Sequence, residues 1–224
     1  MRYAGWRALL ATLVIAGAGV SAAAHVRLPV SATAGDVRFD DPAPAGISYE
    51  WTVSLAKRQT AELVRFVGAL AWNEPSQPVG AKGWTHWSDW VALELAAPAT
   101  VKIVVTAQQG VVGPAGLMRS ALVPAVSLYD GWDETTENEA HTYNAVGNFW
   151  AAMQYLASAA NEKGRSVVTL KRKLPAGRYS IAIGGNPPSL GGASAYPTSD
   201  CDPADEICYR YTGFHGYRAK ITAK

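Results

Sequence analysis

One stretch of the chain limits the possible folds more than any other: L-K-R-K-L-P-A-G-R-Y-S-I-A-I-G-G, at residues 170–185. Its second half alternates large apolar residues with small or polar ones, and a Pro-Ala-Gly turn separates it from the first half. Alternation with a period of two around such a turn is typical of paired β-strands. The pattern of strand, proline-containing turn and strand recurs at residues 91–106. We therefore predict a β-rich fold in which both stretches form hairpins.

The rest of the chain adds further strands and one exception. Residues 148–160 are rich in alanine, contain no glycine or proline, and repeat apolar residues at helical spacing, which predicts a helix. We expect about eight strands, this inserted helix and no second domain, in an all-β antiparallel sandwich or jelly-roll-like fold. The additional strands are predicted at 47–55, 63–72 (with a short helix as the alternative), 123–129 and 209–222, with an extended arm or edge strand within 25–44.

The N-terminal segment has the composition of an export signal. Arg2 and Arg7 precede an apolar run at residues 8–20, and Ser21-Ala22-Ala23-Ala24 provides an A-x-A cleavage pattern. We predict a cleaved signal peptide at 1–24, a β-sandwich domain at 25–224, and a secreted or periplasmic protein; an uncleaved membrane anchor is the alternative. No later segment has the ~20 apolar residues of a membrane span.

Charge and motifs argue against several functions. The chain has 20 basic and 18 acidic residues, and because two of the basic ones lie in the predicted signal, the mature chain is neutral at 18 against 18. A neutral chain has no basic field for nucleic acid. The sequence contains no G-x-S-x-G, H-E-x-x-H, C-x-x-C, P-loop or Rossmann motif, so we expect no enzymatic activity.

An acidic segment with both cysteines is the first candidate site. Cys201 and Cys208 are close in sequence, and in an exported protein such a pair is expected to form a disulfide. Carboxylates on a bent loop are the ligands that calcium prefers. A solvated acidic loop is the alternative, and metal binding by the two thiolates is a minor one. The candidate calcium ligands are Asp200, Asp202, Asp205 and Glu206.

His25 is the second candidate site. If cleavage follows Ala24, the amine and Nδ1 of an N-terminal His25 can bind one metal together with a second histidine. Three nitrogen donors of this kind suit copper. Cleavage after Ala23 would exclude this site, and an ordinary exposed terminal histidine is the alternative. The possible partners are His86, His141 and His215.

The third candidate is W-T-H-W-S-D-W at residues 84–90, with Trp84, Trp87 and Trp90. Aromatic side chains pack cores and also stack on sugar rings. Three tryptophans at this spacing cannot all point inward from one strand, because successive side chains alternate. At least one is therefore expected to be exposed or at an edge. The segment predicts either core packing or a face that binds carbohydrate or protein.

The strands also resemble a known family. The segments W-V-A-L-E-L-A-A-P-A-T-V-K-I-V-V (90–105), P-A-V-S-L-Y-D (124–130), L-P-A-G-R-Y-S-I-A-I-G-G (174–185) and T-G-F-H-G-Y-R-A-K-I-T (212–222) are similar to those of bacterial pre-peptidase C-terminal domains. The resemblance covers about half of the mature chain at the level of pattern. It implies a secreted or surface-attached sandwich that serves as a binding or accessory module. Family members often carry calcium on acidic loops, which Asp130 and Asp133 match only loosely.

These observations lead to one expected function with two alternatives. We expect an exported, non-enzymatic binding or accessory protein at the cell envelope, stabilised by calcium, with a protein or carbohydrate partner. The first alternative is a periplasmic copper-binding protein that uses His25. The second is a structural subunit of an envelope assembly.

Overall fold

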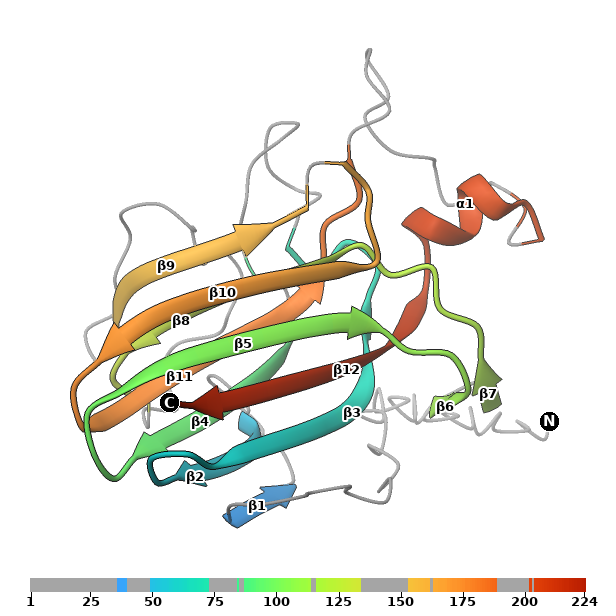
Figure 1. The fold of residues 1–224 in the computed structure, drawn as a ribbon. Coiled ribbons are helices and arrows are strands. Elements are labelled where there is room, and N and C mark those ends of the chain that lie inside the picture. Colours follow the sequence, from blue (N-terminus) through green and yellow to red (C-terminus); the bar gives the residue numbers. More distant parts are fainter. Residues whose placement is uncertain are drawn as a thin grey trace, which may run out of the picture.

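The protein is a sandwich of two β-sheets. The computed structural model describes residues 36–39, 49–72, 84, 87–113, 116–133, 153–161, 163–188, 202 and 204–224. These residues form twelve strands and one short helix. A six-stranded and a four-stranded sheet face each other, and a small two-stranded sheet lies at one end (Figure 1). The predicted all-β sandwich is confirmed.

The six-stranded sheet has the order β1-β2-β4-β11-β8-β9. All its neighbours are antiparallel except β2 and β4, which are parallel. The prediction of a purely antiparallel sandwich was therefore wrong for this pair, because after β2 the chain crosses to the other sheet before it returns as β4. The strands are β1 (Asp36–Phe39), β2 (Tyr49–Leu55), β4 (Asp89–Leu95), β8 (Pro124–Asp130), β9 (Gln154–Ala160) and β11 (Gly177–Gly185).

The four-stranded sheet has the order β10-β5-β12-β3 and is antiparallel throughout. Its strands are β3 (Thr60–Gly68), β5 (Ala99–Ala107), β10 (Val167–Leu174) and β12 (Phe214–Ala223). The remaining elements are the hairpin of β6 (Val111–Gly113) with β7 (Gly116–Met118) and the helix α1 (Glu206–Tyr211). Strands thus occur in each segment where the sequence predicted them, including β1 as an edge strand.

The two predicted hairpins are arches between the sheets. β10 belongs to the four-stranded sheet and β11 to the six-stranded one, and β4 and β5 are divided in the same way. The two arches stack, because β5 pairs with β10 while β4 pairs with β11. Alternation identified the four strands correctly, but it could not reveal their partners, since a hairpin and an arch both need one apolar face on each strand.

A β-bulge in β2 changes which side chains share a face. The register with β4 shifts between Tyr49 and Trp51, so Glu50 is the additional residue. Trp51 joins the core between the sheets, whereas Tyr49 packs on the other side of the six-stranded sheet. In a regular strand, Tyr49 and Trp51 would lie on the same face, because side chains alternate with a period of two.

The predicted helix at 148–160 was wrong over its described part, because residues 154–160 form β9. This strand pairs with β8, with Ala157 opposite Leu128 and Tyr155 opposite Tyr129. Pairing with an otherwise open strand outweighs the helix preference of alanine, because intrinsic propensity is small compared with tertiary contacts. Residues 148–152 lie outside the described part. The helix in the described part of the chain, α1, begins within the predicted acidic segment and ends at Tyr211, so the first residues of the strand predicted at 209–222 are helical instead.

The space between the sheets is filled by apolar side chains from both. Val53, Leu93, Ile103 and Ile221 are fully buried there, and Ile181 of the segment 170–185 joins them. In the part of the chain that the structure describes, no helix has the length and apolar character needed to cross a membrane.

Candidate functional site

The three tryptophans of residues 84–90 have different environments. Trp84 is 0% exposed and Trp90 is 3% exposed, whereas Trp87 is 59% exposed. The expectation that at least one of them is exposed is confirmed. Trp87 contacts Phe214 edge to face, with the ring centroids 4.8 Å apart. Of the three, Trp87 is therefore the side chain that can meet a partner.

Trp84 and Trp90 belong to a second, aromatic cluster on the side of the six-stranded sheet that faces away from the main core. Trp84 stacks on Trp72 at 5.5 Å and meets Trp90 at 6.4 Å. Trp90 lies 5.7 Å from Tyr129, whose ring continues the series to Tyr155 at 5.9 Å. Burial raises the pKa of the Tyr129 hydroxyl well above its ordinary value. No sequence pattern indicated this cluster, although Trp72 and Tyr129 lie at the ends of predicted strands.

Four ionisable residues meet inside the protein near the start of β4, and we call them the buried ionic cluster. Arg65 forms an ion pair with Asp89, and the Tyr217 hydroxyl donates to Asp89 Oδ2 at 2.6 Å. Glu50 accepts a hydrogen bond from the Trp90 backbone N–H at 2.6 Å. The cluster joins both sheets, since its members come from β2, β3, β4 and β12. None of these residues was predicted to be functional, because an isolated charge in an apolar strand gives no indication of its partners.

The charges in this cluster are strongly coupled. Burial and then the nearby Asp89 raise the pKa of Glu50 well above its ordinary value, against the effect of Arg65. Burial also raises the pKa of Asp89, while Arg65 and Tyr217 oppose that shift. Burial works against the charge of Arg65, but Asp89 and Glu50 outweigh it and raise its pKa. The upward shift of the Glu50 pKa favours its protonated form, and protonation of Glu50 would leave Arg65 and Asp89 as a charge-balanced pair.

His215, a predicted copper partner, is enclosed by protein. It is 0% exposed, and its Nδ1 accepts a hydrogen bond from the Ala121 N–H at 3.2 Å. The Tyr209 ring packs against the imidazole, with the ring centroids 4.6 Å apart. The Arg119 guanidinium lies over the Tyr209 ring, 4.4 Å from its centroid. Burial lowers the pKa of His215 to about 4, so the imidazole is neutral at physiological pH.

The acidic segment contains a helix start instead of an open loop. Asp205 is the N-cap of α1, and its Oδ1 accepts from the N–H groups of Ile207 and Cys208 at 2.8 and 3.0 Å. Asp202 Oδ1 accepts from the Ala204 N–H at 2.8 Å. Both carboxylates therefore stabilise the local backbone. Glu206 lies in the first turn of α1.

Several predicted site residues lie outside the described part of the chain: His25, His86, His141, Asp200 and Cys201. The disulfide between Cys201 and Cys208 therefore stays a prediction; Cys208 is a buried residue within α1. Within the described ranges, no group of three or more histidine, cysteine or acidic side chains is arranged to hold a metal ion.

The protein is therefore an open β-sandwich, formed by one mixed sheet and one antiparallel sheet. The buried ionic cluster lies in its interior. Comparisons with known protein families and with curated proteins give no match for this chain. Among solved structures, the fold is similar to that of CorA, a surface-associated copper-binding protein of Methylomicrobium album BG8. The TM-score is 0.51 at 14% identity, over 77% of this chain and 100% of that one. This likeness shows the fold.

Two further structures are more distant. The pre-peptidase C-terminal domain of a Bacillus anthracis collagenase matches 82% of this chain and all of its own length, at 10% identity and a TM-score of 0.33. The chain is thus similar to such a domain at low identity, as the sequence predicted. MopE, a secreted Methylococcus capsulatus protein in which an oxidised tryptophan facilitates copper binding, matches 85% of this chain and 94% of its own, at 12% identity and a TM-score of 0.41. Both scores are too low to carry a functional argument.

Proposed function

We propose that this chain is an exported, non-enzymatic protein that binds copper at the cell envelope. The observation that carries the proposal is the fold, which matches the full length of a surface-associated copper-binding protein at a TM-score of 0.51. The sequence supports it independently, through a predicted signal peptide whose removal would leave His25 at the N-terminus.

The proposed ligands start with His25. Its amine and Nδ1 supply two nitrogen donors, and a second histidine supplies the third. His215 is a poor choice for that second ligand, because the folded chain encloses it and a backbone N–H occupies its Nδ1. We therefore assign the third nitrogen to His86 or His141, the other two histidines of the mature chain.

Calcium is the less favoured metal. Oδ1 of Asp202 and Oδ1 of Asp205 already accept backbone hydrogen bonds, so each carboxylate has only its second oxygen left to contribute to the six to eight oxygens that calcium takes. The predicted calcium set of Asp200, Asp202, Asp205 and Glu206 remains a hypothesis that the same experiment addresses.

The test combines N-terminal sequencing with metal analysis. The exported protein is purified without chelator, its first residue is determined, and its copper and calcium contents are measured after dialysis. We expect His25 as the first residue and about one copper per chain, with affinity reduced 10-fold or more in His86→Ala or His141→Ala, since losing even a residue that only orients a metal ligand costs about 10-fold or more. His215→Gln is the matched control and should retain copper.

Two results would contradict the proposal. If the mature chain begins at Ala24, His25 is not the N-terminal residue and cannot supply both the terminal amine and Nδ1 to the metal. Unchanged copper binding in both the His86→Ala and the His141→Ala variants would show that neither histidine supplies the proposed third nitrogen ligand. Calcium retained in place of copper would instead support the acidic segment as the site.

A further inference from the structure

The outward side of the four-stranded sheet collects positive charge from three strands. Side chains alternate along each strand, so one set enters the core while the other faces outward. The core set includes Ile103, Leu170 and Ala219, and the residues next to them point away from the core. The outward set contains the five cations Lys102, Lys171, Lys173, Arg218 and Lys220, which we call the basic face.

The strand register brings these charges close together. Lys171 of β10 lies directly opposite Lys102 of β5, a position where Cβ atoms are about 5 Å apart and like charges destabilise the pair. Arg218 has an acidic partner, Glu62, at 2.8 Å. Among the described residues, no ion pair joins the four lysines to a carboxylate. A neutral mature chain that gathers like charges on one side has the surface expected for an anionic partner.

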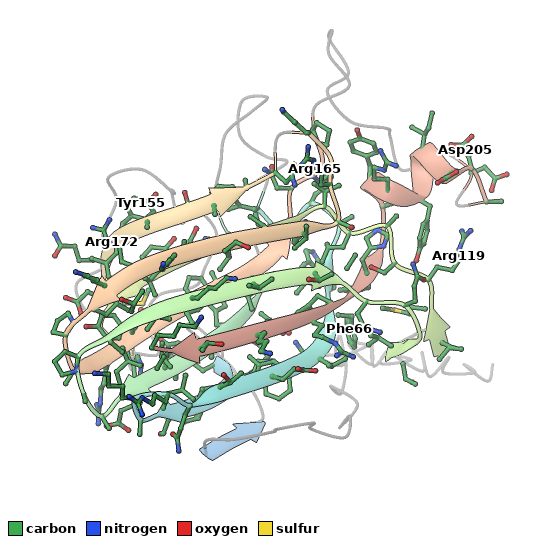
Figure 2. All side chains as sticks on the ribbon, in the orientation of Figure 1. Phe66, Arg119, Tyr155, Arg165, Arg172 and Asp205 are labelled. Atoms are coloured by element: carbon green, nitrogen blue, oxygen red, sulfur yellow. The ribbon has the colours of Figure 1, made fainter. Side chains whose placement is uncertain are left out.

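The same side of the sheet ends in apolar side chains, which we call the apolar end: Phe66, Trp87, Val112, Leu117 and Phe214. Trp87 lies above Gly68, where an added Cβ would meet the Trp87 Cβ at 2.6 Å. Figure 2 shows Phe66 at one end of this sheet and Arg172 of β10 at the other.

The hairpin of β6 and β7 completes the apolar end. Val111 is buried against the outward side of Gly216, where an added Cβ would meet its Cγ2 at 2.7 Å. Val112, the next residue, pairs with Leu117 across the hairpin. Val112 and Leu117 are 45% and 76% exposed, so they project into solvent from the hairpin, which contacts β3 and β12.

We propose that the basic face and the apolar end together dock on the surface of an anionic phospholipid membrane. Lysines near such a surface are attracted to lipid phosphates, and the attraction adds up over neighbouring charges. Tryptophan favours the interface between headgroups and acyl chains, and exposed leucine and valine favour the acyl boundary. A soluble anionic polymer would use the lysines alone and leave the apolar end in water. The proposal is independent of the copper site.

The experiment measures sedimentation of the purified exported protein with two kinds of vesicle. Vesicles of phosphatidylcholine and phosphatidylglycerol should bind the protein, vesicles of phosphatidylcholine alone should bind it weakly, and about 1 M salt should release it, because the Debye length falls to ~3 Å. Lys102→Glu combined with Lys171→Glu should lower the affinity about 10-fold or more. The matched control reverses Lys163 and Arg165, which lie on the connection between β9 and β10, and should bind like the original protein.

A second measurement separates docking from folding. Lys102→Glu alone replaces a repulsive pair with an attractive one, so its thermal midpoint should rise while its vesicle binding falls. Lipids brominated near the headgroup should quench the fluorescence of the protein, and Trp87→Phe should lose most of that quenching. Equal binding to both kinds of vesicle, unchanged binding of the double lysine variant, or binding to heparin without binding to vesicles would each overturn the proposal.

Discussion

The burial of His215 predicts a specific loss of stability in acid. Its pKa is about 4 in the folded protein, against 6.5 in an unfolded chain. The unfolded chain therefore takes up a proton below about pH 6.5 that the folded protein takes up only near pH 4. Because the folded pKa is the lower one, this contribution to stability is present above the unfolded pKa and is lost as the pH falls.

The size of the effect follows from the two pKa values. A difference of 6.5 against about 4 corresponds to roughly 3 kcal/mol in total. The histidine of the unfolded chain titrates near its ordinary pKa, so about 2 kcal/mol of this stability is lost between about pH 7 and about pH 5. Glu50 acts in the opposite direction, since its raised pKa removes stability as the pH increases. The contribution of His215 must therefore be measured as a difference between two proteins that share Glu50.

The assay compares urea unfolding of the original protein and of His215→Gln across this pH range. A glutamine oxygen can accept the Ala121 N–H, as Nδ1 of His215 does. The difference in free energy of unfolding between the two proteins should shrink by about 2 kcal/mol on acidification. A difference that stays constant with pH, or an NMR titration of His215 near its ordinary pKa, would refute the reasoning.

Three other predictions concern packing and charge. Arg65→Met should cost about 3–5 kcal/mol in urea unfolding, because it leaves Asp89 as a buried charge without its partner. Glu50→Gln should gain stability relative to the original protein as the pH rises above the ordinary pKa of glutamate, since it removes the group whose raised pKa costs stability there; equal pH profiles would contradict this. Gly185→Ala should lower the thermal midpoint or prevent folding, because the added Cβ would collide with the Ala69 carbonyl oxygen, and a midpoint equal to that of the original protein would contradict this.

Much of the candidate site depended on information that the sequence does not contain. The spacing of Trp84, Trp87 and Trp90 correctly predicted that one of them is exposed, but which one depends on contacts with Gly68 and Phe214. The acidic segment predicted calcium ligands. In the structure, Asp205 instead caps a helix that the sequence pattern of this segment had not indicated. The residues next to His215 in sequence do not indicate that it is buried, because its burial depends on packing against Tyr209.

Local order along the chain was enough to establish the strands and the class of fold. Alternation with a period of two depends only on which side chains must be apolar, and that pattern is written in consecutive residues such as those of 170–185. The same local pattern misassigned β9, because the pairing with β8 that makes it a strand comes from a distant part of the chain.

Only the tertiary structure decided which strands become neighbours, and the surfaces and charges follow from that choice. Stacked arches join β5 to β10 and β4 to β11, so Lys102 meets Lys171 and a chain with no net charge acquires a basic face. The bulge at Glu50 likewise turns this isolated acid toward the start of β4, where its carboxylate accepts a hydrogen bond from the Trp90 backbone N–H. Pairing across long distances in sequence carries no local signal, since each strand satisfies its own alternation whatever its partner is.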